Sequence, residues 1–152
     1  MGILDQHIAS DLAEHYRTVE SMTSYEVENK LTQGKVNGIA NGSRTLLRLH
    51  RALDFIIAFL VNVCRCKDDE SLSTPAVEAY NNTLANYHGW LIRKAATLAL
   101  YTLGNRTSIL SAMPRYSRDE TLDYIGQLIK SAQAVYDHVQ TVYTDKGILD
   151  LP

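Results

Sequence analysis

The stretch from Arg44 to Leu53, RTLLRLHRAL, runs directly into residues 54–63, DFIIAFLVNV. Together they have the pattern of one long helix, and the second half is almost wholly apolar. A helix of this kind is expected to bury one side in a core. Three arginines nevertheless recur along its first half, at positions 44, 48 and 51. Their role is the first question that the sequence raises.

The three arginines lie on one narrow side of the expected helix. At 3.6 residues per turn, Arg48 is about 40° and Arg51 about 20° away from Arg44 around the helix axis. The spacing is compatible with a solvated face, where arginine stems cover apolar surface and the charged heads reach water. Spacing alone favours this solvated face, but it also permits an anion site, because two guanidinium groups one turn apart fit a phosphomonoester. The unpaired N–H groups of the early turns of a helix also favour an anion.

The rest of the chain also has helical periodicity, and no alternating run with hairpin punctuation is found. The expected class is therefore all-α. The first half of the chain is expected to form a helical region to Leu31, a flexible loop over Gln33–Gly42, and a helix from Arg44 to about Arg65 with Ser43 as its cap. The next helix is opened by Thr74 and Pro75, broken near Gly89 and ended by Gly104, and a short helix over Ser108–Met113 follows it. The last helix is expected from the capping box Ser117–Glu120 to about Tyr143, followed by an ordered or loosely docked tail.

Composition narrows the class of protein. The length of 152 residues fits one domain over residues 1–152, and a net charge of −2 argues against a general nucleic-acid binder. Cys64 and Cys66 have the spacing of neither a redox pair nor a zinc pair, so we expect free thiols and no metal or other cofactor. The longest apolar run, Phe55 to Val61, is too short to span a bilayer, and the expected location is the cytosol.

Three segments resemble a known family: NGSRTLLRLHRAL at 41–53, YNNTLANYHGWLIRKA at 80–95 and YTDKGILDLP at 143–152. The combination is similar to the glycolipid transfer protein superfamily, and within it to the branch that carries ceramide-1-phosphate. The similarity runs from about Glu14 to Pro152. It implies a two-layer helical sandwich that holds a sphingolipid headgroup at its surface and the lipid chains in an apolar pocket between the layers. Transfer in this family needs no covalent chemistry.

The resemblance assigns roles to four residues. Arg44 and Arg48 match the two arginines that grip the lipid phosphate, and glycolipid carriers have a tryptophan where this chain has Arg48. His88 matches the histidine that hydrogen-bonds the ceramide amide carbonyl, although a histidine near a helix break is by itself more often structural. Trp90 would lie near the membrane-docking surface; packing as a partly buried side chain is the alternative. Arg51 receives no contact from the resemblance.

One part of the family pattern is not found. The headgroup centre of the family also uses an aspartate and, one turn later, a lysine or asparagine, upstream of the segment EHYR. Here Asp5 is followed four residues later by Ala9, and Asp11 by His15. We therefore expect the chain to lack roughly the first two helices of a full family domain. Apolar faces would then be open to water, which predicts a destabilised and association-prone protein.

The leading functional hypothesis is non-vesicular transfer of ceramide-1-phosphate between membranes, through transient contact with the cytosolic face of a membrane. The alternative is a truncated interaction module that binds membranes or partner proteins without transferring lipid; glycolipid transfer is less favoured. An enzyme is the least favoured class, because no nucleophile motif, histidine metal pair or glycine-rich phosphate loop is found.

Overall fold

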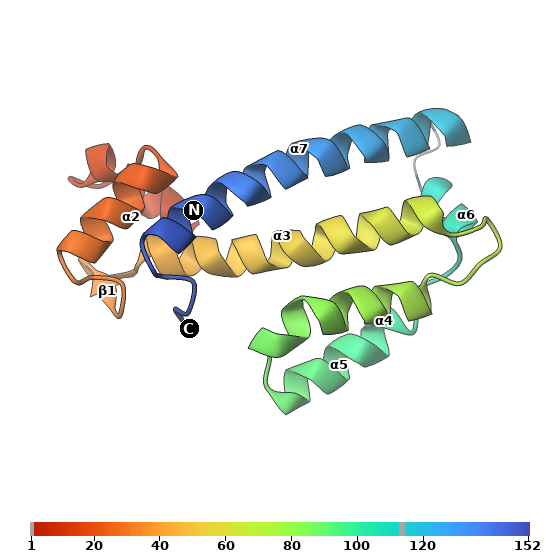
Figure 1. The fold of residues 1–152 in the computed structure, drawn as a ribbon, viewed down its shortest axis with the longest axis horizontal. Coiled ribbons are helices and arrows are strands. Elements are labelled where there is room, and N and C mark those ends of the chain that lie inside the picture. The colour runs from red at the N-terminus through yellow and green to blue at the C-terminus, as the bar shows by residue number, and fades with distance from the viewer. Residues whose placement is uncertain (1, 113–114) are drawn as a thin grey trace. The chain divides into compact units, whose positions relative to one another are not determined.

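The computed structural model describes residues 2–112 and 115–152. Figure 1 shows a predominantly helical chain in which α3 and α7 are the two longest helices. The elements, in chain order, are α1 (Ile3–Ile8), η1 (Ala13–Tyr16), α2 (Val19–Glu28), β1 (Lys35–Val36), β2 (Ile39–Ala40), α3 (Gly42–Arg65), α4 (Ser73–Asn82), η2 (Leu84–Tyr87), α5 (Trp90–Leu100), α6 (Arg106–Leu110) and α7 (Arg118–Asp145).

The long helix expected from the opening stretch is α3, but it begins two residues earlier than predicted. Its cap is Asn41, whose Oδ1 accepts a hydrogen bond from the Arg44 amide at 2.9 Å. The prediction of Ser43 as the cap was wrong, because asparagine caps as well as serine does and stands two residues closer to the start. Ser43 is instead fully buried inside the first turn.

The expected loop over residues 33–42 contains a small hairpin. Lys35 pairs with Ala40 and Val36 with Ile39, in antiparallel register. Asn37 and Gly38 connect the strands, and both have positive φ angles, 50° and 81°. An Asn-Gly pair is the typical sequence of such a two-residue turn, so the expectation of no hairpin signal was wrong at this point. The hairpin is too small to alter the all-α class.

The prediction of Thr74 as the cap of the next helix was wrong, because α4 begins at Ser73 after Leu72 and Thr74 lies in its first turn. The other boundaries follow the predicted signals with shifts of a few residues. The first helical region is divided into α1, η1 and α2, and Thr18 caps α2 by accepting from the Ser21 amide at 3.1 Å. The break at Gly89 is confirmed, since Gly89 precedes the first residue of α5. The short helix expected over Ser108–Met113 corresponds to α6, and Met113 lies outside the described residues.

The capping box at the start of α7 is confirmed. The Ser117 amide donates to Glu120 Oε2 at 2.8 Å, and the Glu120 amide donates to Ser117 Oγ at 3.3 Å. The hydroxyl and then the amide of Ser117 favour the ionised form of the Glu120 carboxyl and hold its pKa below its ordinary value. The helix continues to Asp145, slightly beyond the expected end at Tyr143.

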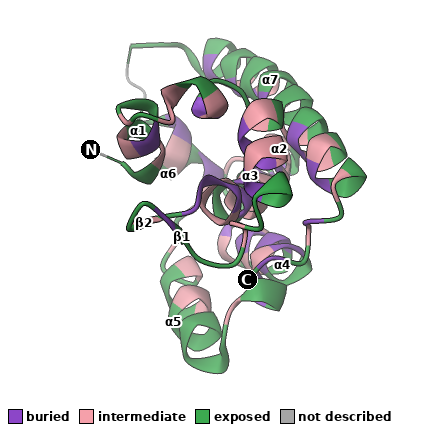
Figure 2. Ribbon diagram, turned by 90° about the vertical axis from the view of Figure 1, so that its left-hand side faces the viewer, coloured by how far each residue is buried: buried purple, intermediate pink, exposed green. Residues whose placement is uncertain are grey.

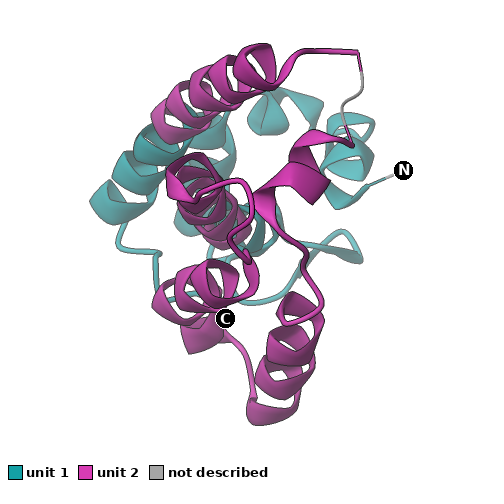
Figure 3. Cartoon of the chain, turned by 90° about the vertical axis from the view of Figure 1, so that its right-hand side faces the viewer, with its two compact units in different colours: residues 1–50, 135–152 teal, residues 51–134 magenta. Residues whose placement is uncertain are grey.

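Contacts divide the chain into two compact units, residues 1–50 with 135–152 and residues 51–134 (Figure 3). Helices α3 and α7 each contribute residues to both units. The core of the first unit consists of Leu47, Val139, Tyr143, Ile148 and Leu151. The core of the second consists of Val63, Cys66, Leu72, Leu110 and Ile125. The single domain expected over residues 1–152 stays a prediction.

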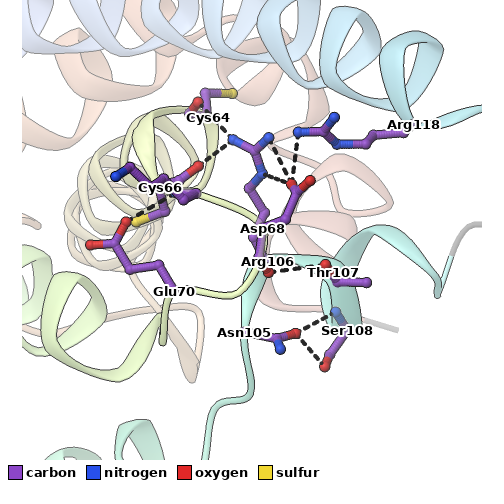
Figure 4. Close-up of polar contacts among 10 residues, drawn as sticks. Cys64, Cys66, Asp68, Glu70, Asn105, Arg106, Thr107, Ser108 and Arg118 are labelled. Carbon is purple, nitrogen blue, oxygen red and sulfur yellow. Dashed lines mark hydrogen bonds and ion pairs between the residues drawn. The ribbon is translucent and has the colours of Figure 1, made fainter.

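Within the second unit, Arg106 closes the C-terminal end of α3 (Figure 4). Its guanidinium donates to the carbonyl oxygens of Cys64, at 3.2 Å, and of Cys66. Asp68 balances the buried charge: its Oδ1 lies 3.0 Å from Arg106 Nε and 2.7 Å from an Arg118 nitrogen. A cation at the last carbonyls of a helix also complements the helix dipole. The sequence pattern did not predict this cluster of Arg106, Asp68 and Arg118, because its members are far apart along the chain.

Candidate functional site

The predicted phosphate ligands lie on successive turns at the start of α3, in the first unit. Arg44 is half-buried and Arg48 is exposed. Between them Leu47 is only 1% exposed and belongs to the core of that unit. The packing of Leu47 fixes the rotation of the helix, so the two arginines stay on a defined side of it.

The N–H groups at the start of α3 already have an anion, the carboxylate of Glu26 on α2. Glu26 is fully buried; its Oε1 accepts from the Gly42 amide at 2.6 Å and its Oε2 from the Ser43 amide at 2.9 Å. Carboxylates are favoured at this end of a helix because the dipole and the unpaired amides are positive. These two amides do bind an anion, but it is an internal carboxylate, so they are not available to an external one. A phosphate near Arg44 has to be held by side chains.

Two buried tyrosines complete the surroundings of Glu26. The Tyr16 hydroxyl donates to Glu26 Oε1 at 2.7 Å, and the Tyr143 hydroxyl donates to the Ser43 carbonyl at 2.8 Å. Burial raises the pKa of both hydroxyls well above the usual range, and the nearby Glu26 carboxylate raises the pKa of each further. Both tyrosines therefore remain protonated donors. No sequence motif marked Glu26, whose importance comes from contacts between α2 and α3.

The tail after α7 is docked on the first unit, as the prediction of an ordered tail allowed. Ile148 and Leu151 are buried in its core, and Lys146 Nζ donates to Ser24 Oγ at 2.8 Å. At the end of the tail the main-chain oxygen of Pro152 accepts from Arg44 Nε at 3.3 Å. Arg48, in contrast, has no polar partner within residues 2–112 and 115–152.

Arg51, the third arginine on the same side of α3, has an aromatic partner. In the second unit, the guanidinium carbon of Arg51 lies 3.9 Å above the centre of the Tyr87 ring. A cation over an aromatic face is attracted by the ring quadrupole. The resemblance gave Arg51 no contact, and spacing along one helix could not indicate Tyr87.

His88 follows η2 in the second unit and is half-buried. Its Nδ1 lies 2.8 Å from the hydroxyl oxygen of Tyr80 on α4. No described residue is bonded to Nε2, the other ring nitrogen. His88 therefore has one nitrogen tied to the protein and one available for a ligand.

Helix α5 carries the predicted membrane-docking residue; it is mostly exposed and has no buried residue (Figure 2). Trp90 is 71% exposed and Leu91 73% exposed, so Trp90 does not pack as a partly buried side chain. A groove of about 380 Å³ runs along the helix, lined by Trp90, Arg93, Lys94, Thr97, Leu98 and Tyr101. The surface combines apolar side chains with two cations.

The first unit also contains an apolar cavity of about 240 Å³. It is lined by Leu4, Ile8, Tyr16, Arg17, Thr18, Val19, Met22 and Leu46. Its wall includes Leu46, which stands between Arg44 and Arg48 in the sequence. Apolar space is thus present in the unit that carries both arginines.

The described part of the chain has no group of three histidine, cysteine or acidic side chains placed to hold a metal ion. No helix in residues 2–112 and 115–152 is both long enough and apolar enough to cross a bilayer. Cys64 and Cys66 are free thiols whose pKa values are raised by burial.

Comparison with known proteins decides the family. The family described as "Glycolipid transfer protein" matches residues 1–115. The chain belongs to the glycolipid transfer protein family. The ceramide-1-phosphate transfer protein of Mus musculus is 38% identical over 156 residues, which cover all of this chain and 72% of the mouse protein. The corresponding protein of Homo sapiens is 34% identical over 154 residues, with the same coverage of both chains.

Solved structures confirm the all-α fold of this family. The crystal structure of the lipid-free mouse ceramide-1-phosphate transfer protein has a TM-score of 0.89 at 39% identity, and the match covers 99% of this chain and 72% of the mouse chain. The human protein in complex with 12:0 ceramide-1-phosphate has a TM-score of 0.90 at 33% identity, covering 99% of this chain and 73% of the human chain. The family is one of lipid transfer proteins, and these relatives are named for the phosphorylated sphingolipid.

Proposed function

We propose that this protein binds ceramide-1-phosphate and transfers it between membranes without vesicles. The observation that carries the proposal is the pair Arg44 and Arg48 on successive turns of a helix fixed by a buried leucine. Arg48 has no polar partner among the described residues, so its charge is available to an external anion. Relatives 34–38% identical over the whole of this chain are named ceramide-1-phosphate transfer proteins.

A phosphomonoester suits these two side chains better than a sugar does. Two guanidinium forks offer several N–H donors in planes that match phosphate oxygens bidentately. A sugar headgroup is usually held on a flat aromatic ring, and neither Arg44 nor Arg48 provides one. The Glu26 carboxylate occupies the helix amides, so we assign phosphate binding to the side chains of Arg44 and Arg48 alone.

The remaining site residues receive complementary roles in this proposal. His88 donates a hydrogen bond from Nε2 to the amide carbonyl of the ceramide. The apolar cavity of the first unit accommodates part of a hydrocarbon chain. No step of this function makes or breaks a covalent bond, so the protein acts as a carrier and not as an enzyme.

Helix α5 provides the membrane contact in this proposal. Trp90, Leu91 and Leu98 present apolar surface, and Arg93 and Lys94 supply positive charge beside it. Tryptophan favours the interface between headgroups and acyl chains, and cations are attracted to anionic lipids. The contact is peripheral and transient, and the proposed location is the cytosol, at the cytosolic face of membranes.

A liposome transfer assay tests the proposal. Donor vesicles would carry fluorescent ceramide-1-phosphate, ceramide or galactosylceramide at equal content, and transfer to acceptor vesicles would be followed over time. We expect transfer of ceramide-1-phosphate to be much faster than that of the other two lipids. A preference for galactosylceramide would refute the phosphate assignment.

The second candidate is an interaction module that does not transfer lipid. The exposed apolar surface of α5 favours it, because such a surface binds membranes or protein partners even without a lipid cargo. Mass spectrometry of the purified protein separates the two candidates. Co-purified ceramide-1-phosphate supports a carrier, whereas vesicle binding with no bound lipid and no transfer supports the module.

A further inference from the structure

A hydrogen bond joins the buried Tyr80 to the half-buried His88. Tyr80 lies in α4, is 3% exposed, and its hydroxyl oxygen is 2.8 Å from His88 Nδ1. Its ring packs edge-on against Phe55 of α3, with 6.2 Å between ring centres and an interplanar angle of 88°. All three residues belong to the second unit. The hydroxyl is therefore held at a fixed position by core packing.

The direction of this hydrogen bond follows from the available donors and acceptors. Burial raises the pKa of the Tyr80 hydroxyl, so it keeps its proton at neutral pH. No other described residue accepts from this hydroxyl. If Nδ1 carried a proton and donated instead, the buried hydroxyl proton would have no acceptor, at a large cost. The hydroxyl therefore donates, and Nδ1 is the acceptor.

A neutral imidazole carries one proton on one of its two nitrogens. Because Nδ1 accepts from Tyr80, the proton lies on Nε2. The nitrogen without a partner among the described residues is thus an N–H donor, and a carbonyl oxygen is an acceptor that fits it. With the opposite tautomer, a lone pair on Nε2 would meet the lone pairs of the carbonyl and repel them.

We propose that Tyr80 is a positioning residue that fixes His88 as an Nε2–H donor and thereby selects a carbonyl acceptor in the ligand. This role rests on the proposed function, in which His88 binds the ceramide amide. Tyr80 does not contact the lipid in this proposal and acts through His88. It also holds the plane of the imidazole, since one ring nitrogen is tied to a buried hydroxyl.

Nitrogen-15 NMR of the lipid-free protein tests the tautomer independently of lipid transfer. Histidine-labelled wild type should show His88 with a protonated Nε2 and an unprotonated, hydrogen-bonded Nδ1. The Tyr80→Phe variant keeps the ring and removes only the hydroxyl, and the Nδ1 resonance should shift. Tyr87→Phe is the matched control, because the neighbouring Tyr87 hydroxyl has no partner among the described residues. A protonated Nδ1 in wild type, or an unchanged spectrum in Tyr80→Phe, would overturn the proposal.

A double-mutant cycle tests the effect on ligand binding. Tyr80→Phe should reduce the rate of ceramide-1-phosphate transfer by about fivefold, the usual value of one hydrogen bond. In a His88→Gln background, whose amide N–H does not depend on Tyr80, the same change should have no effect. An equal loss in both backgrounds would show a merely structural role and overturn the proposal. Absence of transfer by wild type would refute the proposed function, while the NMR result would still decide the tautomer.

Discussion

Arg44 Nε donates a hydrogen bond of 3.3 Å to the main-chain oxygen of Pro152, across 108 residues of sequence. The bond uses the inner nitrogen of the guanidinium and leaves its two terminal nitrogens without a partner in the described part of the chain. The tail thus orients a predicted phosphate ligand. Any change that releases the tail should affect both stability and lipid binding.

Shortening Leu151 to alanine should release the tail. Leu151 is 7% exposed and packs in the core of the first unit, so we expect a loss of about 2–3 kcal/mol in the free energy of unfolding. Ceramide-1-phosphate binding should weaken as well, because Arg44 loses its partner. Urea unfolding measures the first effect, and Leu128→Ala, at a 54% exposed position, is the control. Equal stability of the two variants would show that the tail is not docked.

Replacing Glu26 with glutamine should destabilise the start of α3. The carboxylate accepts from the Gly42 amide, the Ser43 amide and the Tyr16 hydroxyl, whereas an amide side chain has only one acceptor oxygen. Buried donors would be left unpaired, at a cost of about 2 kcal/mol. Thermal unfolding against the exposed control Glu28→Gln checks this. A loss no greater than that of the control would contradict the assigned role of Glu26.

Tyr16 should make stability fall at high pH. Its pKa is raised in the folded state, by burial and then by Glu26, above the ordinary value of about 10. Above pH 10 the unfolded chain releases this proton and the folded chain keeps it. The free energy of unfolding therefore drops by about 1.4 kcal/mol per pH unit for this one group. Above pH 10, the free energy of unfolding of Tyr16→Phe should fall with pH less steeply than that of the wild type, by that amount. Between pH 7 and 9 the two proteins should show parallel curves of unfolding free energy against pH. Equal slopes above pH 10 would refute the assignment.

Trp90→Ala should weaken binding to vesicles. Trp90 is 71% exposed, and inserting its ring at a membrane interface would remove a large apolar area from water. We expect partitioning onto anionic vesicles to fall by about tenfold. Leu128→Ala, on α7, removes an exposed apolar side chain outside α5 and should have little effect. Sedimentation with vesicles measures both, and similar losses in the two variants would contradict docking through α5.

The fold was readable from the sequence where signals are local. The apolar run after Leu53, Gly89 and the Ser117–Glu120 capping box each mark a helix or a boundary that the structure has. The Asn37-Gly38 turn was also a local signal, but the short strands beside it have too few residues to show alternation. Competition between neighbouring caps, Asn41 and Ser43, shifted the start of α3 by two residues.

The site was readable only in part, because its chemistry depends on contacts between distant segments. Arg44 and Arg48 share a helix face, which spacing alone indicates. The Glu26 carboxylate beneath the helix amides, the Tyr87 ring under Arg51 and the Tyr80 hydroxyl at His88 are tertiary contacts. No periodicity in the chain encodes which side chains these helices bring together.

The most direct test of the central claim measures ceramide-1-phosphate transfer by the Arg44→Gln/Arg48→Gln double variant. Arg65→Gln/Lys67→Gln is the control, because it removes two positive charges at the other end of α3. We predict that the first variant keeps the helical circular dichroism of the wild type and loses nearly all transfer, while the control transfers like the wild type. Wild-type transfer by the Arg44→Gln/Arg48→Gln variant would contradict the claim that these two side chains hold the lipid phosphate.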